Sequence, residues 1–357
     1  MKRYGKLYPQ ICSFENLVAA AYRARRGKRR RPDVLAFHFQ QERLLLELHD
    51  ELLEKRYEPG PYRSFWIRDP KQRLISAAPY RDRIVHHALC QVIEPLFERG
   101  FIHASYANRV GKGTHAALDH ATRLARRYPW VLKCDIEKYF PSIDHAILME
   151  RLGRKIKCRD TLWLIERIVA NSNPQEEVLR YFPGDGLFTP LERRRGLPIG
   201  NLTSQFFANV YLDGFDHFCQ ERLGCRAYLR FADDFLVFGP DKRVLGALPA
   251  RMQERLDGLR LMLNPRKCQV LPVRDGVPFL GWQLYPDHRR LRRATGVRIE
   301  RRLKELARKQ REGAIGFDRV RASLMSWIGH LKHGDTWGLR RRLFAAAVFG
   351  PPRRASE

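Results

Sequence analysis

Apolar residues recur along this chain of 357 residues with two different periods, and the period changes several times. The helical period, about every third or fourth residue, predicts helices over 13–57, 81–98, 114–127, 296–312, 318–333 and 336–349. Alternating or short apolar runs beside turn residues predict strands over 62–78, 130–135, 227–238 and 277–285. The fifth helix is expected to begin after an Asp318 N-cap, and the stretch 153–185 is mixed.

Two of the apolar runs carry acids where a strand would end. Asp233 and Asp234 lie between the apolar halves of Tyr228-Leu-Arg-Phe-Ala-Asp-Asp-Phe-Leu-Val-Phe238, which predicts a hairpin with acids at its turn. Asp135 ends a second run that begins at Trp130. A solvated acidic turn explains the first pattern alone. If the two strands are neighbours, however, the carboxylates could hold two metal ions for phosphoryl transfer.

The charge balance points to a polyanionic partner. The chain has 67 Lys and Arg against 39 Asp and Glu, a formal net charge of +28, and nucleic acid is the commonest partner of so basic a protein. Anionic membranes and solvated charge are the alternatives. No apolar run is long enough to span a bilayer, and the beginning of the sequence lacks the apolar segment of a secretion signal, so we expect a cytoplasmic protein without membrane association.

The seven cysteines form no Cys-x-x-Cys pair. Neither a structural zinc site nor a disulfide framework is therefore expected, and the apolar neighbours of the cysteines indicate reduced, partly buried thiols.

Several ordered segments, within roughly residues 60–350, resemble the motifs of reverse transcriptases. Trp130–Asp144 resembles palm motif A, and the segment around Asp233 resembles motif C, the Tyr-x-Asp-Asp box, with Phe231 in place of Tyr. The resemblance implies an α/β (α+β) right-hand polymerase with helical fingers, a mixed α/β palm and a short helical thumb. The implied divisions are an N-terminal helical extension (1–60), fingers (61–125), palm with a fingers-type insertion at about 150–190 (126–285), and thumb with C-terminal tail (286–357).

The resemblance also assigns the chemistry. Asp135, Asp233 and Asp234, with the backbone carbonyl of Ile136, would hold two magnesium ions, for which manganese could substitute. Lys267, in a segment similar to motif D, would protonate the departing pyrophosphate as a general acid. A solvated lysine is the alternative.

A second group of residues would bind the incoming nucleotide. Arg73 is expected to clamp the triphosphate, with Arg68, Lys71 and Arg81 as neighbouring candidates, although a plain basic surface hairpin explains the same residues. Phe140, five residues after Asp135, would pack under the sugar and exclude a 2′-hydroxyl; a core phenylalanine is the alternative.

The segment Ile199-Gly200-Asn-Leu-Thr-Ser204-Gln205 departs from the usual pattern. Most reverse transcriptases carry Gln-Gly-x-x-x-Ser-Pro here, and this variant is similar to the enzymes of diversity-generating retroelements. Isoleucine offers no hydrogen bond near the templating base, so pairing would be checked less strictly. A helix N-terminus with an apolar staple explains the segment without function.

Further residues are candidates for contact with nucleic acid. Arg109 and Lys112 lie in a glycine-containing turn, where a tight turn capping a helix at Thr114 is the alternative. Trp282 resembles part of the primer grip, or it packs between palm and thumb. The basic run 25–31 would be either a phosphate contact or a solvated loop.

The resemblance implies an RNA-directed DNA polymerase that makes cDNA from a retroelement template RNA, with errors at template adenines, for mutagenic retrohoming. Its partners would be template RNA, the RNA/DNA hybrid, deoxynucleoside triphosphates and an oligomer of a small basic accessory protein. The gene would be bacterial, archaeal or phage-encoded. A group II intron-like or retron-type enzyme is the nearest alternative. A catalytically silent RNA-binding scaffold is the other, although the three acids and Lys267 argue against it.

Overall fold

The computed structural model describes residues 2–68, 72–172 and 178–345. Its α-helices are α1 (Tyr8–Cys12), α2 (Phe14–Ala24), α3 (Pro32–Phe39), α4 (Gln41–Leu53), α5 (Tyr80–Glu98), α6 (Thr114–Arg127), α7 (Tyr139–Ser142), α8 (His145–Gly153), α9 (Arg159–Ala170), α10 (Thr189–Glu192), α11 (Leu202–His217), α12 (Lys242–Asp257), α13 (Arg293–Arg311), α14 (Phe317–Leu331) and α15 (Trp337–Ala345). Its strands are β1 (Arg63–Ile67), β2 (Arg73–Ala77), β3 (Trp130–Asp135), β4 (Tyr228–Phe231), β5 (Asp234–Gly239), β6 (Gln269–Pro272), β7 (Val277–Phe279), β8 (Trp282–Leu284) and β9 (Arg289–Leu291).

The N-terminal helices pack against one another and against α5, and one hairpin lies between α4 and α5 in the sequence. Helices α1 and α2 pack on α5, and α4 packs on α2. Helices α2 and α4 each bury an apolar stripe, which includes Leu17 in α2 and Leu48 in α4. Strands β1 and β2 pair antiparallel, with Ile67 opposite Arg73. The predicted hairpin is therefore present, although residues 69–71 of its turn, Lys71 included, lie outside the described residues.

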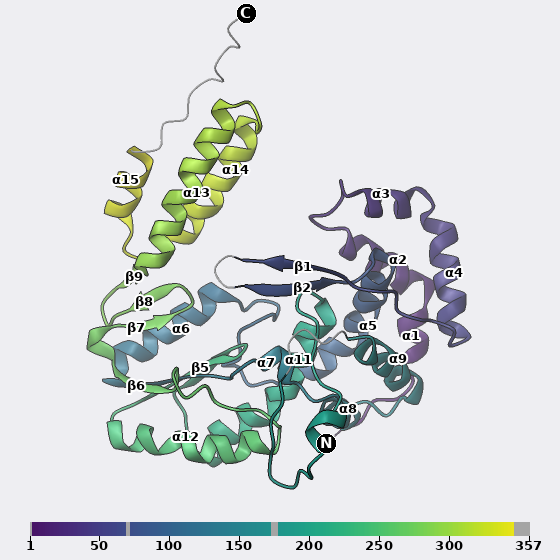
Figure 1. Ribbon diagram of the computed structural model, residues 1–357, viewed down its shortest axis with the longest axis horizontal. Helices are drawn as coiled ribbons and strands as arrows, with labels where there is room; N and C mark the ends of the chain where they lie inside the picture. Colours follow the sequence, from purple (N-terminus) through teal and green to yellow (C-terminus); the bar gives the residue numbers. More distant parts are fainter. Residues whose placement is uncertain (1, 69–71, 173–177, 346–357) are drawn as a thin grey trace, which may run out of the picture.

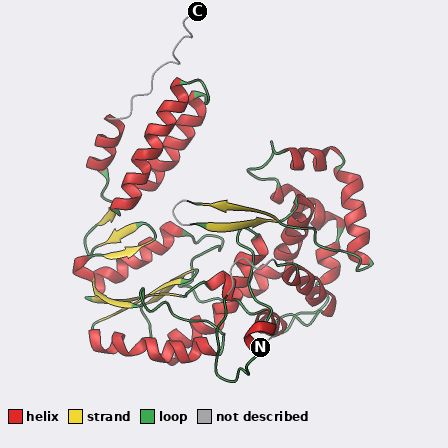
Figure 2. Cartoon of the chain, viewed as in Figure 1, coloured by secondary structure: helices red, strands yellow, loops and turns green. Residues whose placement is uncertain are grey.

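The palm is built on a four-stranded antiparallel sheet in the order β4-β5-β3-β6 (Figures 1 and 2). The central strand β3 pairs with both β5 and β6, so the first acid-bearing run lies directly beside the second. Helix α12 packs against β3, β5 and β6, and α11 is buried along most of its length. The sheet thus has a rigid helical support, and its loop ends are free to carry chemistry.

The thumb stands away from the palm in Figure 1 and has a small core of its own, formed by Ile299, Leu303, Leu331 and Leu343. It begins after the three-stranded sheet β7-β8-β9. At the junction the His333 ring stacks on His115 of α6, with 3.6 Å between ring centroids, and the His330 ring lies against the Trp282 ring.

Two details of the predicted thumb helices need correction. Helix α14 begins at Phe317 after the extended residue Gly316, so Asp318 lies in the first turn and is not the N-cap. Its carboxylate still favours the helix there, because it faces the positive end of the helix dipole. Helix α13 begins at Arg293, three residues before the predicted start, and residues 346–349 of the predicted last helix lie outside the described residues. In the described part of the chain, no helix is both long and apolar enough to cross a membrane.

Candidate active site at the end of the palm sheet

The ends of three palm segments bring the predicted acids together. Asp135, the last residue of β3, lies directly opposite Asp234, the first residue of β5. The backbone N–H of Ile136 donates to the Asp233 carbonyl oxygen at 3.2 Å, which ties the turn of the β4–β5 hairpin to the end of β3. Residues 98 positions apart in sequence therefore share one end of the sheet.

A buried ion pair, Arg230 with Asp216, lies beside this turn and contacts it. Arg230 and Asp216 are both almost completely buried, and two guanidinium nitrogens of Arg230 donate to the two carboxylate oxygens at 2.7 Å each. The third nitrogen donates to the Ala232 carbonyl oxygen at 3.0 Å. Ala232 has a φ of +56°, a left-handed conformation that is strained for a residue with a side chain. The pair thus helps to hold the strained residue that immediately precedes Asp233.

The environment of the acids disfavours their charge. Burial raises the pKa of Asp234 to about 6, and the neighbouring Asp233 and Asp135 add to this, while the ammonium of Lys133 opposes it. Burial also raises the pKa of Asp233, as does Asp135, whereas Lys267 and Arg73 lower it. Crowded carboxylates of this kind become stable as anions when a cation joins them.

Two lysines approach the acids. The Lys267 ammonium lies 2.6 Å from a carboxylate oxygen of Asp135, on a turn that is anchored where the Asn264 N–H donates to the Asp135 carbonyl at 2.8 Å. Lys133 precedes Asp135 by two residues, so both side chains lie on one face of β3, and its ammonium donates to the Pro278 carbonyl at 2.7 Å. Sequence reasoning missed Lys133; the available signal was a lysine inside an otherwise apolar strand.

The donor set fits a hard divalent cation, because carboxylate and carbonyl oxygens are the ligands that magnesium prefers. Within the described ranges, no three His, Cys, Asp or Glu side chains converge closely enough to enclose a metal by themselves. A site that shares its ion with substrate phosphates needs fewer protein ligands than a closed site. Asp135, Asp233 and Asp234 are the side chains that would provide them.

The fingers place one predicted phosphate ligand near the acids. Arg73 opens β2, is exposed, and contributes positive charge that lowers the pKa of Asp233. Arg68 is exposed just beyond β1. Arg81 is turned to the N-terminal helices, since it pairs with Glu51 and lies 5.3 Å over the Tyr57 ring. A role for Arg81 in nucleotide binding stays a prediction.

The loop before α11 contacts both the β1–β2 hairpin and Phe140, the residue predicted to exclude a 2′-hydroxyl. The Ile199 carbonyl accepts from the Ser76 N–H of β2 at 3.1 Å, and the Leu197 N–H donates to the Phe140 carbonyl at 2.9 Å. Gly200 has a φ of +116°, and a Cβ there would lie 3.0 Å from the Ile75 side chain. Ile199 and Phe140 are both half-buried. Gln205 lies in the first turn of α11 and is also half-buried.

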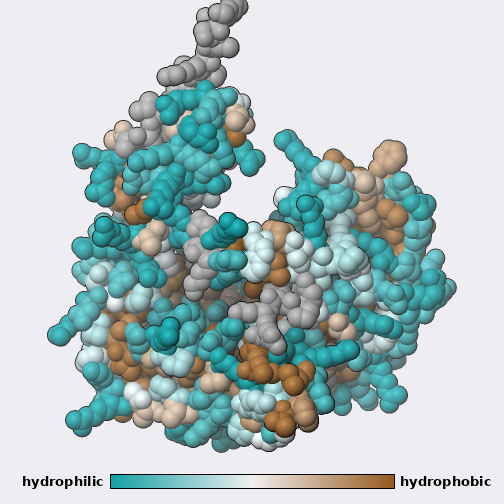
Figure 3. All heavy atoms as spheres, viewed as in Figure 1, coloured by the Kyte–Doolittle hydropathy of each residue, from teal (hydrophilic) through white to brown (hydrophobic). Residues whose placement is uncertain are grey.

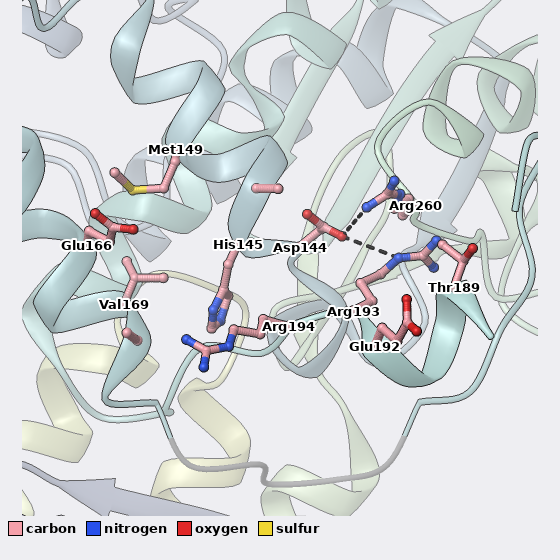
Figure 4. A pocket seen from close by; sticks show the side chains of 12 residues that line it. Asp144, His145, Met149, Glu166, Val169, Thr189, Glu192, Arg193, Arg194 and Arg260 are labelled. Atoms are coloured by element: carbon pink, nitrogen blue, oxygen red, sulfur yellow. Dashed lines mark hydrogen bonds and ion pairs between the residues drawn. The ribbon is translucent and has the colours of Figure 1, made fainter.

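A pocket lined by both charged and apolar side chains includes Asp144, His145 and Arg193 (Figure 4). The buried Asp144 caps α8, accepting from the Ile147 N–H at 3.1 Å, and forms ion pairs with Arg260 and Arg193. The neighbouring His145 bonds the Gly196 carbonyl through Nε2 at 2.8 Å. The His145 contact ties the start of α8 to the start of the Gly196–Gly200 loop, which gives His145 a structural role.

The three predicted nucleic-acid contacts have internal partners. Arg109 donates to both carboxylate oxygens of Glu98 and, at 2.7 and 2.8 Å, to two backbone carbonyls. Lys112 donates to the His103 carbonyl at 3.0 Å. Trp282 is fully buried, and Gly334 approaches it so closely that a Cβ would lie 2.1 Å from the ring. These contacts give structural roles to Arg109 and Trp282, and binding of nucleic acid by any of the three stays a prediction.

In the space-filling view, the thumb and the fingers rise on either side of an open hollow, and hydrophilic side chains dominate the surfaces that face it (Figure 3). The palm lies at the bottom of this hollow (Figure 1). The arrangement suits a polyanionic duplex, whose backbone is bound chiefly by charge.

Comparison with known proteins agrees with this geometry. Residues 67–284 match the family model described as reverse transcriptase (RNA-dependent DNA polymerase), which covers more than half of the chain. The chain belongs to the reverse transcriptase family. The predicted fold class and the predicted activity, an RNA-directed DNA polymerase, are thereby confirmed.

Individual relatives of this reverse transcriptase are distant. Protein YkfC of Escherichia coli K12 is 28% identical over 291 residues, which cover 68% of this chain and 72% of YkfC. Group II intron-encoded protein LtrA of Lactococcus lactis is 25% identical over 180 residues, half of this chain but only 28% of LtrA. A Candida albicans telomerase structure, determined with a fragment of telomeric RNA, is similar with a TM-score of 0.43 at 13% identity, over 73% of this chain and 54% of the telomerase chain.

Proposed function

We propose that this reverse transcriptase copies a retroelement template RNA into cDNA and misincorporates nucleotides opposite template adenines. The observation that carries the proposal is the pair Ile199-Gly200, where most reverse transcriptases have Gln-Gly. The same segment is similar to the enzymes of diversity-generating retroelements, which diversify a target gene through such errors.

Residue 199 can affect fidelity because its loop is attached to the fingers hairpin. Its backbone is fixed to β2 by the bond from the Ser76 N–H to the Ile199 carbonyl, so the residue at 199 holds a constant position relative to Arg73. An isoleucine there contributes shape but no hydrogen bond. Discrimination between right and wrong pairs depends on polar contacts that only the right pair satisfies, and this chain offers one fewer.

Each active-site group then has a role in chain extension. Two magnesium ions, when bound, would activate the primer 3′-oxygen and neutralise charge on the phosphates. Asp135, Asp233 and Asp234 would hold these ions, and Arg73 would orient the triphosphate. Lys267 holds a proton beside Asp135 and delivers it to the leaving pyrophosphate.

The partners follow from the resemblance and from charge. Template RNA and the RNA/DNA hybrid are polyanions, which a net charge of +28 attracts without reading sequence. A small basic accessory protein that forms an oligomer completes the proposed assembly.

The first prediction concerns fidelity. In Ile199→Gln, we expect fewer misincorporations, with the largest reduction opposite template adenine, because the amide restores a polar contact near the templating base. Sequencing cDNA made on one RNA template by wild type and variant measures the error spectrum directly.

Ile199→Val is the matched control, since it keeps an apolar branched side chain and should leave the spectrum unchanged. If Ile199→Gln remains active and its adenine errors equal those of wild type, the proposed link between residue 199 and infidelity is wrong. Arg73→Ala, near the same nucleotide, should alter both rate and spectrum.

A second prediction concerns the sugar. We expect Phe140→Ala to admit ribonucleotides, raising their use relative to deoxynucleotides by about ten-fold or more, the usual value of one steric exclusion in a pocket. Competition between the two nucleotide types during primer extension measures this ratio.

Phe140→Tyr keeps the ring and should keep the discrimination. Unchanged discrimination in an active Phe140→Ala enzyme would show that Phe140 is only a core residue.

A second candidate function, that of an intron-encoded reverse transcriptase, is favoured by two of the relatives. LtrA and the nuclear intron maturase 2 of Arabidopsis thaliana, which is 27% identical over 138 residues, are intron proteins by name. The matches span 28% and 19% of those proteins. The same cDNA sequencing separates the two functions, because an intron-type enzyme would show no excess of errors at adenine.

A further inference from the structure

Two cysteines face each other beside the candidate active site. Cys134 belongs to β3, and Cys268 immediately precedes β6, so both residues adjoin the pair of Lys133 and Gln269 that ends the β3–β6 ladder. The two Sγ atoms are 2.8 Å apart. This separation is only about 0.8 Å longer than a disulfide bond of roughly 2.05 Å.

The backbone is already suitable for such a bond. A disulfide forms between cysteines whose side chains face each other, with Cα atoms roughly 4.4–6.8 Å apart. Two Sγ atoms only 2.8 Å apart show that the two side chains already face each other. Forming the bond therefore requires side-chain movement of less than about 1 Å.

The two thiols differ in access. Cys134 is completely buried in the main core, whereas Cys268 is only half-buried at the start of the β6 segment. A small oxidant can reach the Cys268 sulfur, and the Cys134 sulfur is then close enough to react with the oxidised Cys268. One partly exposed and one buried sulfur is an arrangement that suits an attacking and a resolving cysteine.

We propose that Cys134 and Cys268 are a site of reversible oxidation to a disulfide by a small-molecule disulfide such as oxidised glutathione. The Cys268 thiolate attacks one glutathione sulfur, forming a mixed disulfide and releasing one glutathione thiol. The Cys134 sulfur then attacks the Cys268 sulfur and breaks the mixed disulfide, and the second glutathione leaves as a thiolate that takes up the proton of Cys134. Two protein thiols are oxidised, and one oxidised glutathione is reduced to two thiols.

The disulfide would restrict the movement of the residues next to the two cysteines in sequence. Cys134 directly precedes Asp135, and Cys268 directly follows Lys267, whose ammonium lies 2.6 Å from Asp135. A covalent link between the two segments restricts the Lys267 turn relative to the acids. This consequence rests on the proposed function, in which Lys267 must follow the departing pyrophosphate, so the oxidised enzyme extends primers more slowly.

The first experiment tests the chemistry alone. The full-length protein is incubated with oxidised glutathione, alkylated, digested without reductant and analysed by mass spectrometry. We expect a peptide pair joined through Cys134 and Cys268 that disappears after dithiothreitol. If the half-exposed Cys158 acquires glutathione while Cys134 and Cys268 remain unlinked, the proposal is overturned.

The second experiment measures primer extension before oxidation, after it, and after reduction. The extension rate of wild type should fall about ten-fold or more on oxidation, which is less than the full contribution of a general acid. Dithiothreitol should restore the rate. Cys268→Ser should resist, and Cys158→Ser should behave as wild type. A fully linked enzyme that extends at the normal rate overturns the effect on activity. An inactive reduced enzyme would contradict the proposed function and leave the mass-spectrometric result standing.

Discussion

Asp233→Asn is expected to lower the rate of DNA synthesis by roughly 10³-fold, equivalent to ~4 kcal/mol of lost transition-state stabilisation. The amide keeps the size of the side chain and removes the negative charge that would bind a divalent cation. The same change relieves repulsion, because burial and Asp135 raise the pKa of Asp233 in the fold. We therefore expect the melting temperature to stay equal or rise. Primer extension and a thermal unfolding curve on one preparation test both expectations.

RNA binding should survive in Asp233→Asn, because the basic surface and not the acid supplies affinity, and filter binding checks this. The control is Asp275→Asn, an exposed acid beside Arg274, which should have no effect on extension. An Asp233→Asn enzyme that extends primers within a few-fold of wild type would remove Asp233 from the active site.

Arg230→Met is expected to destabilise the protein by about 3–5 kcal/mol, because it leaves the Asp216 carboxylate buried without its cation. Both members of the pair are 1% exposed, so solvent cannot compensate for the missing charge. Urea unfolding of wild type and variant measures the loss. A loss below about 1 kcal/mol would show that water or another group reaches Asp216 and that the pair is not essential to the fold.

The double variant Arg230→Met with Asp216→Leu separates stability from positioning. Replacing both charges by apolar groups of similar size is often neutral, so much of the stability should return. DNA synthesis should stay low, because the Ala232 carbonyl still lacks the guanidinium that holds the turn before Asp233. Full recovery of both properties would mean that the pair only stabilises the core.

The sequence was sufficient for features that depend on neighbouring residues. The β4–β5 hairpin, β3 and the helices α5 and α6 all follow from local periods and turn residues, and the two acidic sites meet on adjacent strands as expected. Local patterns draw attention to Asp135, Asp233 and Asp234, because carboxylates that end apolar runs on neighbouring strands can share a cation, and their role as metal ligands stays a prediction.

Other features required the packed structure. The Arg230–Asp216 pair joins residues of β4 and α11 that no local period relates, and Lys133 is recognisable as a neighbour of Asp234 only once β3 and β5 are paired. Charge alone does not separate the two roles of a basic residue, because Arg109 is similar to a phosphate ligand in sequence while its guanidinium also donates to Glu98 and to two backbone carbonyls. Whether a basic side chain serves the fold or a ligand depends on partners that lie far away in sequence.

The separate core of the thumb has a mechanical consequence. Its apolar residues, Ile299, Leu303, Leu331 and Leu343, are buried against one another, while its junction with the palm includes ring contacts such as that of His333 with His115. Tilting the thumb as a unit therefore disturbs few buried aliphatic contacts and leaves both cores intact. If a duplex binds in the hollow, we expect such a motion to change the width of the grip, at the cost of the Trp282 and His115 contacts of the junction.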